Sequence, residues 1–256
     1  MNNKKILFAY DLDNTLIHSH RSRSEGDICI ELLEGREQSF ITPRARQLIY
    51  QVQAEENVMF VPVTTRSEEQ YRRIQWQDSC TPELALVCNG SVLLRNGVPD
   101  PEWLRESQSM TQPFADELKR LCDLYSCREC FRTVRIVGDM FLFAYCTDGA
   151  DIEKIAADCA ADTELCTRYS GRKLYFFPPA ADKGRAVRRL SQMLGASEII
   201  AAGDSVIDFP MLRTADYALV PDADTAELLG DDVNSVCCGE APFAEFILDF
   251  VLNKAE

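Results

Sequence analysis

The chain has 256 residues, of which 46% are hydrophobic, and a formal net charge of -14, so it can form one large domain or two smaller ones with separate cores. The negative charge argues against nucleic acid or an anionic membrane as a partner, because both would be repelled over most of the surface, and no stretch reaches transmembrane length. Eleven cysteines, an odd number, and an N-terminus without a signal-peptide pattern favour a reduced, cytoplasmic location.

The first predicted element is a short apolar strand over residues 6–10 that ends at two carboxylates, Asp11 and Asp13. A run this short and this apolar is typical of a strand buried inside a parallel sheet, and open α/β sheets bind ligands at the carboxyl ends of their strands. Two carboxylates so close repel each other, which predicts a metal site or a raised pKa. One could act as a nucleophile and the other as an acid/base. The alternative is a solvated acidic turn.

Residues 18–40 are polar and charged, with a possible β-ribbon around residues 28–32, and we interpret this segment as a flap over the crevice. Thr42-Pro43 then provides a helix start, with a cap followed by a proline in the first turn. The next strand, residues 58–63, leads into Thr64-Thr65-Arg66, and Ser67 with Gln70 forms a capping box for another helix.

A third buried strand is predicted over residues 84–87, closed by Asn89-Gly90, and Asn96-Gly97 marks a hairpin. The order so far is strand, helix, strand, helix, strand, which predicts a parallel sheet with right-handed crossovers. From residue 102 to residue 177 the pattern changes to helix, strand, strand, repeated once. This pattern predicts a small α+β domain, an antiparallel sheet backed by helices, inserted into the first domain.

The chain returns to the first domain after Pro178-Pro179, where Asp182 caps a helix that ends at Gly195. A strand over residues 199–202 then runs into Gly203 and a second acidic turn with Asp204 and Asp208. The fold class predicted is therefore α/β, a Rossmann-like parallel-sheet core formed by residues 1–101 and 178–256, with residues 102–177 as an inserted α+β cap domain.

Four strand ends or helix starts now carry the polar groups of a phosphoryl-transfer site: Asp11 with Asp13, Thr64, Lys183, and Asp204 with Asp208. On these motifs the chain resembles phosphatases of the haloacid dehalogenase (HAD) superfamily, in particular the Cof-type and sucrose-phosphatase-like branch with a large α/β cap. The resemblance covers the whole chain, and the motifs occur in the family's order.

The resemblance implies a catalytic role for four residues. Asp11 would be the nucleophile that forms an aspartyl-phosphate, and Asp13 the general acid/base. Thr64 would hydrogen-bond the transferring phosphoryl group, and Lys183 would neutralise it.

The resemblance also implies that Mg²⁺ is bound by Asp11, by the backbone carbonyl of Asp13, by Asp204 and, through its water shell, by Asp208. Oxygen ligands in octahedral geometry suit this ion. The residues implied to approach the substrate are Thr65, Arg66, Asn89 and Gly90.

Three positions depart from the family's pattern. Ile207 stands where the family usually has asparagine, which removes a polar group from the metal shell. Asn14 and Thr65 each replace a common glycine, and the segment of residues 18–40 is longer than is usual in the branch.

The expected function is Mg²⁺-dependent hydrolysis of a small phosphorylated metabolite, with a sugar phosphate as the expected substrate. The alternatives are a phosphotransferase or mutase and a non-catalytic, receiver-like phosphate sensor. Asp13 argues against the sensor, because an acid/base beside the nucleophile speeds dephosphorylation. The cap strands also carry cations, and strand alternation aims some of them at the crevice, while the alternative for each is a solvated surface charge: Arg132, Arg135, Arg168, Arg172 and Lys173.

Overall fold

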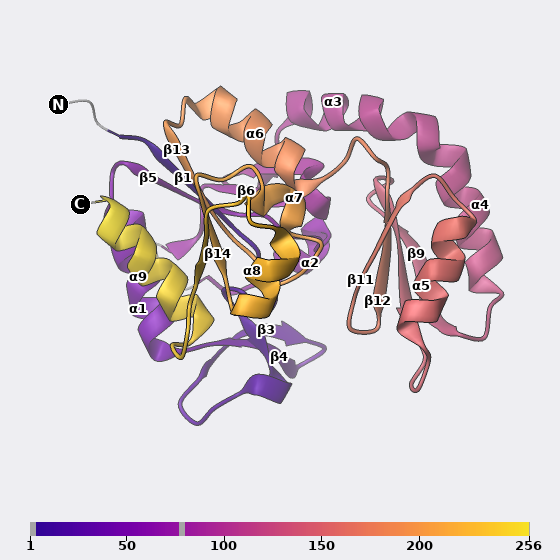
Figure 1. The fold of residues 1–256 in the computed structure, drawn as a ribbon, viewed down its shortest axis with the longest axis horizontal. Coiled ribbons are helices and arrows are strands. Elements are labelled where there is room, and N and C mark those ends of the chain that lie inside the picture. The colour runs from indigo at the N-terminus through magenta and orange to yellow at the C-terminus, as the bar shows by residue number, and fades with distance from the viewer. Residues whose placement is uncertain (1–3, 77–79, 256) are drawn as a thin grey trace.

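The computed structural model describes residues 4–76 and 80–255. A five-stranded parallel sheet, in the order β15-β14-β13-β1-β5, forms the centre of the larger part of the molecule (Figure 1). Its strands are β1 (Ile6–Tyr10), β5 (Val58–Pro62), β13 (Glu198–Ala202), β14 (Tyr217–Val220) and β15 (Ser235–Cys237). The α/β class predicted from the sequence is confirmed.

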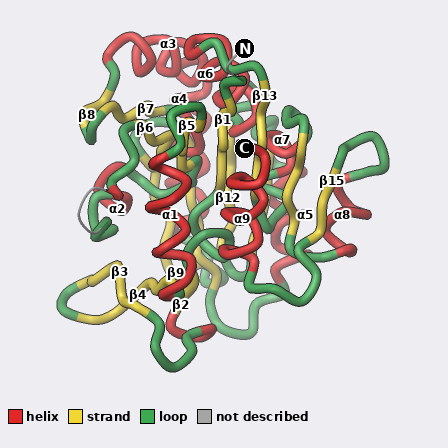
Figure 2. The backbone as a smooth tube through the Cα atoms, turned by 90° about the vertical axis from the view of Figure 1, so that its left-hand side faces the viewer, coloured by secondary structure: helices red, strands yellow, loops and turns green. Residues whose placement is uncertain are grey.

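Alternation along β1 gives each face of the sheet its own core. Ile6, Phe8 and Tyr10 belong to one cluster, whereas Leu7 and Ala9 belong to another. Helices α1 (Pro43–Ala54) and α9 (Phe243–Ala255) lie side by side over the first face (Figure 2), and α6 (Lys183–Leu194), α7 (Phe209–Leu212) and α8 (Ala223–Leu229) contribute to the second. All five residues of β1 are fully buried, which explains its continuous apolar run.

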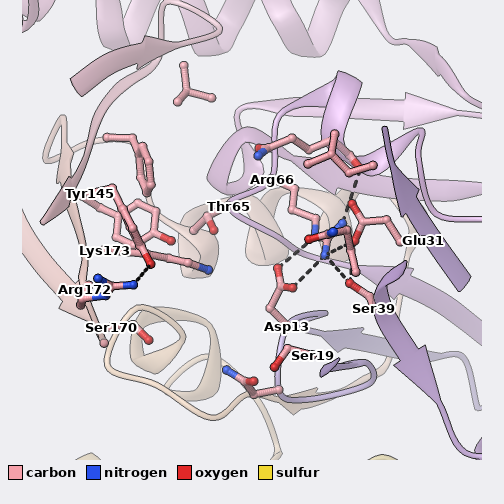
Figure 3. Close-up of a pocket in the computed structure, with 18 of the residues that line it drawn as sticks. Asp13, Ser19, Glu31, Ser39, Thr65, Arg66, Tyr145, Ser170, Arg172 and Lys173 are labelled. Atoms are coloured by element: carbon pink, nitrogen blue, oxygen red, sulfur yellow. Dashed lines mark hydrogen bonds and ion pairs between the residues drawn. The ribbon is translucent and has the colours of Figure 1, made fainter. Parts of the chain in front are cut away.

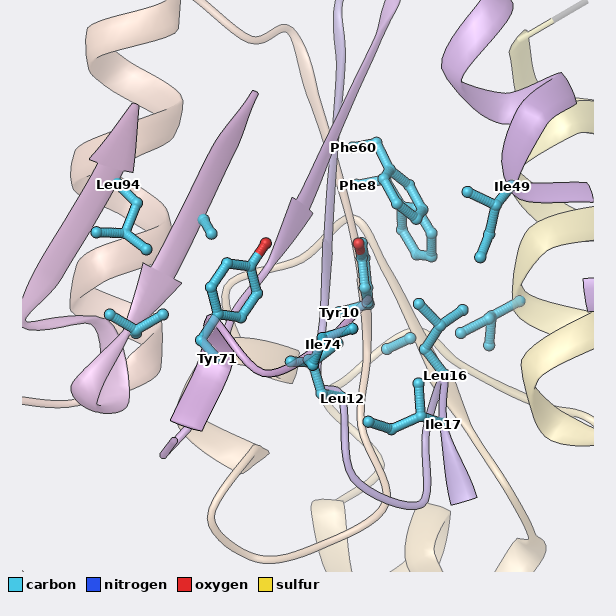
Figure 4. Packing of buried hydrophobic residues seen from close by; sticks show 14 of the residues in the cluster. Phe8, Tyr10, Leu12, Leu16, Ile17, Ile49, Phe60, Tyr71, Ile74 and Leu94 are labelled. Atoms are coloured by element: carbon cyan, nitrogen blue, oxygen red, sulfur yellow. The ribbon is translucent and has the colours of Figure 1, made fainter. Parts of the chain in front are cut away.

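Three aromatic rings pack together in the first core, among aliphatic side chains (Figure 4). The ring centroid of Tyr10 lies 5.0 Å from that of Phe8 and 4.4 Å from that of Phe60 on the neighbouring strand. These rings fix β1 against β5 through contacts on adjacent strands. They therefore fix the carboxyl end of β1, which Asp11 directly follows.

The third predicted strand, β6 (Leu84–Val87), departs from expectation. It lies beside β5 but pairs with it only through one parallel bridge, Val63 to Leu86, and its main partner is β7 (Val92–Arg95) in an antiparallel sheet with β8 (Val98–Pro99). The Thr64 amide donates to the Leu86 carbonyl, but Pro62, on the same edge, has no N–H to donate. The ladder therefore cannot extend further back along β5.

The segment expected as a flap forms a three-stranded antiparallel sheet. Its strands are β2 (His18–Ser19), β3 (Ile28–Leu33) and β4 (Arg36–Ile41), with a short 3₁₀ turn, η1 (His20–Ser22), after β2. β3 and β4 project from the end of the central sheet at which β1 emerges (Figure 2). The capping box at Ser67 is present and opens the short helix α2 (Glu68–Tyr71).

The inserted region forms a separate four-stranded antiparallel sheet, in the order β11-β12-β10-β9, with its own apolar cluster. Its strands are β9 (Phe131–Val137), β10 (Phe141–Cys146), β11 (Cys166–Ser170) and β12 (Lys173–Phe177), and its helices are α4 (Ala115–Ser126) and α5 (Ile152–Ala161). Helix α3 (Pro101–Thr111), which precedes it, was not predicted. Its Trp103 is buried in the second core cluster, so α3 crosses the expected boundary at residue 102.

Phe8→Ala is expected to lower the free energy of unfolding by about 3–5 kcal/mol, because it leaves a cavity in the first core beside Tyr10 and Phe60. The measurement is urea unfolding followed by circular dichroism. The control is Leu124→Ala, at a side chain that is 40% exposed on α4, where we expect a change within about 0.5 kcal/mol. Equal effects of the two substitutions would contradict the packing of Phe8 in the first core.

Candidate active site

Lys183 brings together the carboxylates that follow two neighbouring strands. Its Nζ lies 2.5 Å from Asp11 Oδ1 and 2.6 Å from Asp208 Oδ1, and the lysine is 1% exposed. Asp11 directly follows β1 and Asp208 lies in the loop after β13, so the ammonium joins the ends of adjacent strands. Burial lowers the pKa of Lys183, but the two carboxylates outweigh it and raise the pKa above its usual range.

The first turn of α6 determines the position of Lys183. The Asp182 carboxylate caps this helix by accepting from the Arg185 amide, and Gly184 allows close approach to α7. A Cβ on Gly184 would lie 2.0 Å from the Pro210 carbonyl oxygen. The glycine therefore lets the first turn of α6 sit deep enough for Lys183 to reach both carboxylates.

Asp11, Asp204 and Asp208 form a cluster whose ligand oxygens all lie within 4.8 Å of one another. Burial raises the pKa of Asp11 well above its usual value; Lys183 lowers it, and the neighbouring aspartates raise it further. Burial and Asp208 raise the pKa of Asp204 to about 6. Three carboxylates that repel one another, those of Asp11 and Asp208 buried and that of Asp204 half-buried, fit a divalent cation, which would relieve the repulsion and accept oxygen ligands.

Ser205 and Gly203 hold Asp208 in place. The Ser205 amide and hydroxyl donate to Asp208 Oδ2 at 3.1 and 3.0 Å, so both carboxylate oxygens of Asp208 are bonded. A Cβ on Gly203 would lie 2.4 Å from the Asp208 Cβ, which explains glycine there. Ile207, which stands in place of the family's usual asparagine, lines the hollow with an apolar side chain.

Asp13 does not join the carboxylate cluster. Its two oxygens accept from Arg66 at 2.9 Å from Nε and 2.8 Å from Nη2, a bidentate pair, although burial opposes the charge of Asp13. Hydrogen bonds and charge from Arg66 outweigh that burial and lower the pKa of Asp13. Asp13 is therefore held as a carboxylate by Arg66.

Glu31, from the flap strand β3, holds Arg66 on its other side. Arg66 Nη2 lies 2.9 Å from Glu31 Oε2, Arg73 Nε lies 3.1 Å from Oε1, and the Ser39 hydroxyl donates to Oε2 at 2.6 Å. The Glu31 side chain is 3% exposed. Figure 3 shows Arg66 between Asp13 and Glu31. Glu31 was not among the site residues predicted from the sequence, although a carboxylate in the middle of an apolar ribbon indicates a buried partner.

The side chains of Thr64 and Thr65 lie in different surroundings. Thr65 lines the hollow with the aspartates, whereas Thr64 is 1% exposed and its hydroxyl accepts from the Arg66 amide at 3.1 Å. Asn14, which replaces a common glycine, adopts a φ of 63°, a left-handed conformation that asparagine tolerates.

Asn89 and Gly90 line a different small hollow, together with Trp103 and Asp182. Asn89 Nδ2 donates to the Ala181 carbonyl at 3.1 Å, and the Trp103 indole donates to the Gly90 carbonyl at 3.0 Å. These contacts tie the end of β6 to α3 and to the loop before Lys183. The expected approach of Asn89 and Gly90 to the substrate stays a prediction.

The carboxylate hollow opens into a larger cavity of about 630 Å³ between the flap and the inserted sheet. The hollow and the cavity share lining residues. Among them are Asp13 and Thr65 from the larger part of the molecule and Lys173 from the inserted sheet. In Figure 3 Lys173 reaches from the inserted sheet toward Asp13 and Thr65. The flap, the central sheet and the inserted sheet thus enclose one continuous crevice.

A family model described as haloacid dehalogenase-like hydrolase matches residues 134–220, which include Lys183, Asp204 and Asp208. This part of the chain is therefore similar to haloacid dehalogenase-like hydrolases. The resemblance stated from the motifs is confirmed, and the family match supports a phosphatase. No curated protein matches the chain. Within residues 4–76 and 80–255, no helix combines the length and the apolar character needed to cross a bilayer.

Solved structures of this haloacid dehalogenase-like fold match almost the whole chain. Sucrose-phosphatase from Synechocystis sp. PCC6803, in complex with sucrose and phosphate, has a TM-score of 0.67 at 17% identity, with 98% of each chain covered. The Thermoplasma acidophilum protein 0175 also has a TM-score of 0.67, at 16% identity, with 99% of this chain and 100% of that chain covered. The C-terminal domain of C. albicans trehalose-6-phosphate phosphatase has a TM-score of 0.58 at 9% identity, with 98% and 93% covered.

Glu31→Ala is expected to lower the free energy of unfolding by about 3–5 kcal/mol, because it leaves Arg66 and Arg73 without their buried partner. The matched control is Glu37→Ala, which removes the ion pair with Arg23, where both side chains are almost half exposed. We expect that control to cost about 0–1 kcal/mol. Chemical unfolding of both variants measures the difference, and a Glu31 effect as small as the Glu37 effect would contradict a structural role for the buried pair.

Proposed function

We propose that this protein is a Mg²⁺-dependent phosphatase that acts on a small phosphorylated metabolite, a sugar phosphate, through an aspartyl-phosphate on Asp11. The observation that carries the proposal is the buried arrangement of Asp11 against Lys183, beside the further carboxylates Asp204 and Asp208. The sucrose and trehalose phosphatases that share the fold support the substrate class.

In the proposed reaction an Asp11 oxygen attacks phosphorus in line with the leaving alkoxide. The Lys183 ammonium, 2.5 Å from that carboxylate, offsets the negative charge of the nucleophile and of the phosphoryl oxygens. Mg²⁺ would be held by Asp11, Asp204 and the Asp13 backbone carbonyl, with Asp208 on its water shell, and would supply further positive charge to the phosphoryl oxygens. Thr64 and Thr65 would donate hydrogen bonds to the phosphoryl oxygens. Thr65 lines the hollow, and the Thr64 hydroxyl, which accepts from the Arg66 amide, keeps its proton for donation.

Asp13 is proposed to give its proton to the leaving alkoxide and later to take one from the attacking water. In the structure Arg66 pairs with both Asp13 oxygens and lowers the pKa of Asp13, so Asp13 must first leave at least one of these bonds and take up a proton from water before it can act as an acid. We assign Arg66 the role of holding Asp13 in the crevice until substrate enters. Residues 102–177 are proposed as the cap that closes over the substrate and excludes water.

Asp11→Asn is expected to lower the turnover of p-nitrophenyl phosphate by at least roughly 10³-fold, because the amide is nearly isosteric with the carboxylate but cannot attack phosphorus. The measurement is initial-rate hydrolysis with Mg²⁺ present. The thermal transition of the variant must match that of the unmodified protein or exceed it. Turnover near the unmodified rate would rule out Asp11 as the nucleophile.

Mg²⁺ is expected to raise the thermal transition temperature of the protein, because an ion that binds only the folded state stabilises it. EDTA should reverse this shift and abolish hydrolysis. Asp204→Asn should remove most of the shift, whereas Asp224→Asn, in the first turn of α8 and away from the cluster, should leave it unchanged. A shift that survives Asp204→Asn in full would contradict the proposed metal site.

A further inference from the structure

The larger part of the crevice is much more basic than the protein as a whole. The 630 Å³ cavity is lined by two carboxylates, Asp13 and Glu31, while the chain carries a net charge of -14. Against these two, its cationic lining residues are Arg21, Arg66, Arg73, Arg135, Arg172 and Lys173. Concentrating positive charge in one cavity of an acidic protein requires a reason beyond solubility.

Half of these cations have carboxylate partners. Arg66 and Arg73 share Glu31, and Arg66 also binds Asp13. Arg172 pairs with Asp148, outside the cavity, and donates to the Tyr145 hydroxyl at 2.6 Å. These three therefore add little unbalanced charge.

The other three cations, Arg21, Arg135 and Lys173, make no ion pair within the part of the chain that the structure describes. They come from opposite walls, since Arg21 belongs to η1 of the flap and the other two to the inserted sheet. Lys173 also lines the carboxylate hollow, where it can serve the transferring phosphoryl group. Arg21 and Arg135 line the larger cavity and not the carboxylate hollow, so they lie beyond the residues that the phosphoryl group needs, and Arg135 also borders a separate hollow beside α2.

Arg135 is held by the aromatic floor of the cavity. It pairs in register with Phe143, and its guanidinium carbon lies 5.4 Å from the centre of that ring. Tyr175 pairs in register with Phe143 on the other side, and its ring lies 5.4 Å away, so all three side chains share one face of the sheet. A carbon skeleton packed on these rings would present a terminal group to a guanidinium already held in position.

We propose that the leaving group of the substrate carries a second anionic group, a carboxylate or a second phosphate, which binds at Arg135 with Arg21 opposite. This inference rests on the proposed phosphatase function and narrows its substrate class from sugar phosphates in general to phosphorylated acids and bisphosphates. A neutral hydroxyl at that place would leave both guanidinium groups without an anion, whereas a carboxylate or phosphate gains charge-assisted hydrogen bonds. The positive cavity also attracts a doubly anionic substrate to an otherwise repelling surface.

The test compares substrates that differ in the second group alone. One pair is glucitol 6-phosphate and 6-phosphogluconate, both open chains that differ only at C1, and the other is fructose 6-phosphate and fructose 1,6-bisphosphate, all assayed for kcat/KM with Mg²⁺. We expect the more anionic member of at least one pair to be preferred by about tenfold or more, the size of a charge-assisted hydrogen bond. A preference in the first pair alone indicates a carboxylate, and one in the second alone indicates a phosphate.

Arg135→Gln and, separately, Arg21→Gln should reduce this preference by about tenfold. Arg132→Gln is the matched control, because Arg132 lies on the same strand, is exposed and does not line the cavity. Its preference should equal that of the unmodified protein. The two arginine variants come from different elements, so a folding defect in one leaves the other to decide, and the thermal transition of each is measured first.

Hydrolysis of p-nitrophenyl phosphate distinguishes a failure of the second-anion site from a failure of the proposed phosphatase function. If this aryl phosphate is hydrolysed but neither pair shows a preference, or if the preference survives both arginine substitutions, the second-anion site is overturned while the phosphatase function stands. If the aryl phosphate and all four metabolites remain intact with Mg²⁺, the proposed function fails and this inference fails with it.

Discussion

The ammonium of Lys183 is the contact on which the rest of the site depends. Asp11, Asp204 and Asp208 are crowded at the ends of two adjacent strands, and three carboxylates in a buried place repel one another. Lys183 is bonded to two of them, and its own burial is tolerable only because they surround it. Three local features bring these charges together. Asp182 caps α6, Gly184 lets α6 approach α7 closely, and Gly203 leaves room for the Asp208 side chain.

A second set of charges connects the flap to the reacting end of the crevice. Glu31 is anchored in the flap by Ser39 and holds Arg66, which in turn holds Asp13. Because Glu31 is almost fully buried, the flap cannot move away from the crevice without separating a buried ion pair. The long segment after the first motif therefore has a physical role, which is to fix the side chain that positions the proposed acid/base.

The crevice thus has two ends of opposite character. At one end, carboxylates in excess of lysine favour a cation, and at the other, arginines in excess of carboxylates favour an anion. With a divalent cation bound at the first end, a substrate that is anionic at two places would satisfy both ends at once. This arrangement also explains how a chain with a net charge of -14 accepts a negatively charged ligand.

The sequence by itself determined the strands that carry the site and the residue types at their ends, because a buried apolar run followed by carboxylates has few other solutions in an α/β fold. It also determined the helix at Lys183, since both of its caps are local features. It did not determine the partners. Three points depend on residues far apart in the chain: whether Asp13 faces the carboxylate cluster or Arg66, whether Thr64 or Thr65 lines the hollow, and whether β6 extends the main sheet beyond Pro62. Only the tertiary structure decided these points, because hydrogen bonds and ion pairs between distant segments leave no periodic trace in the sequence.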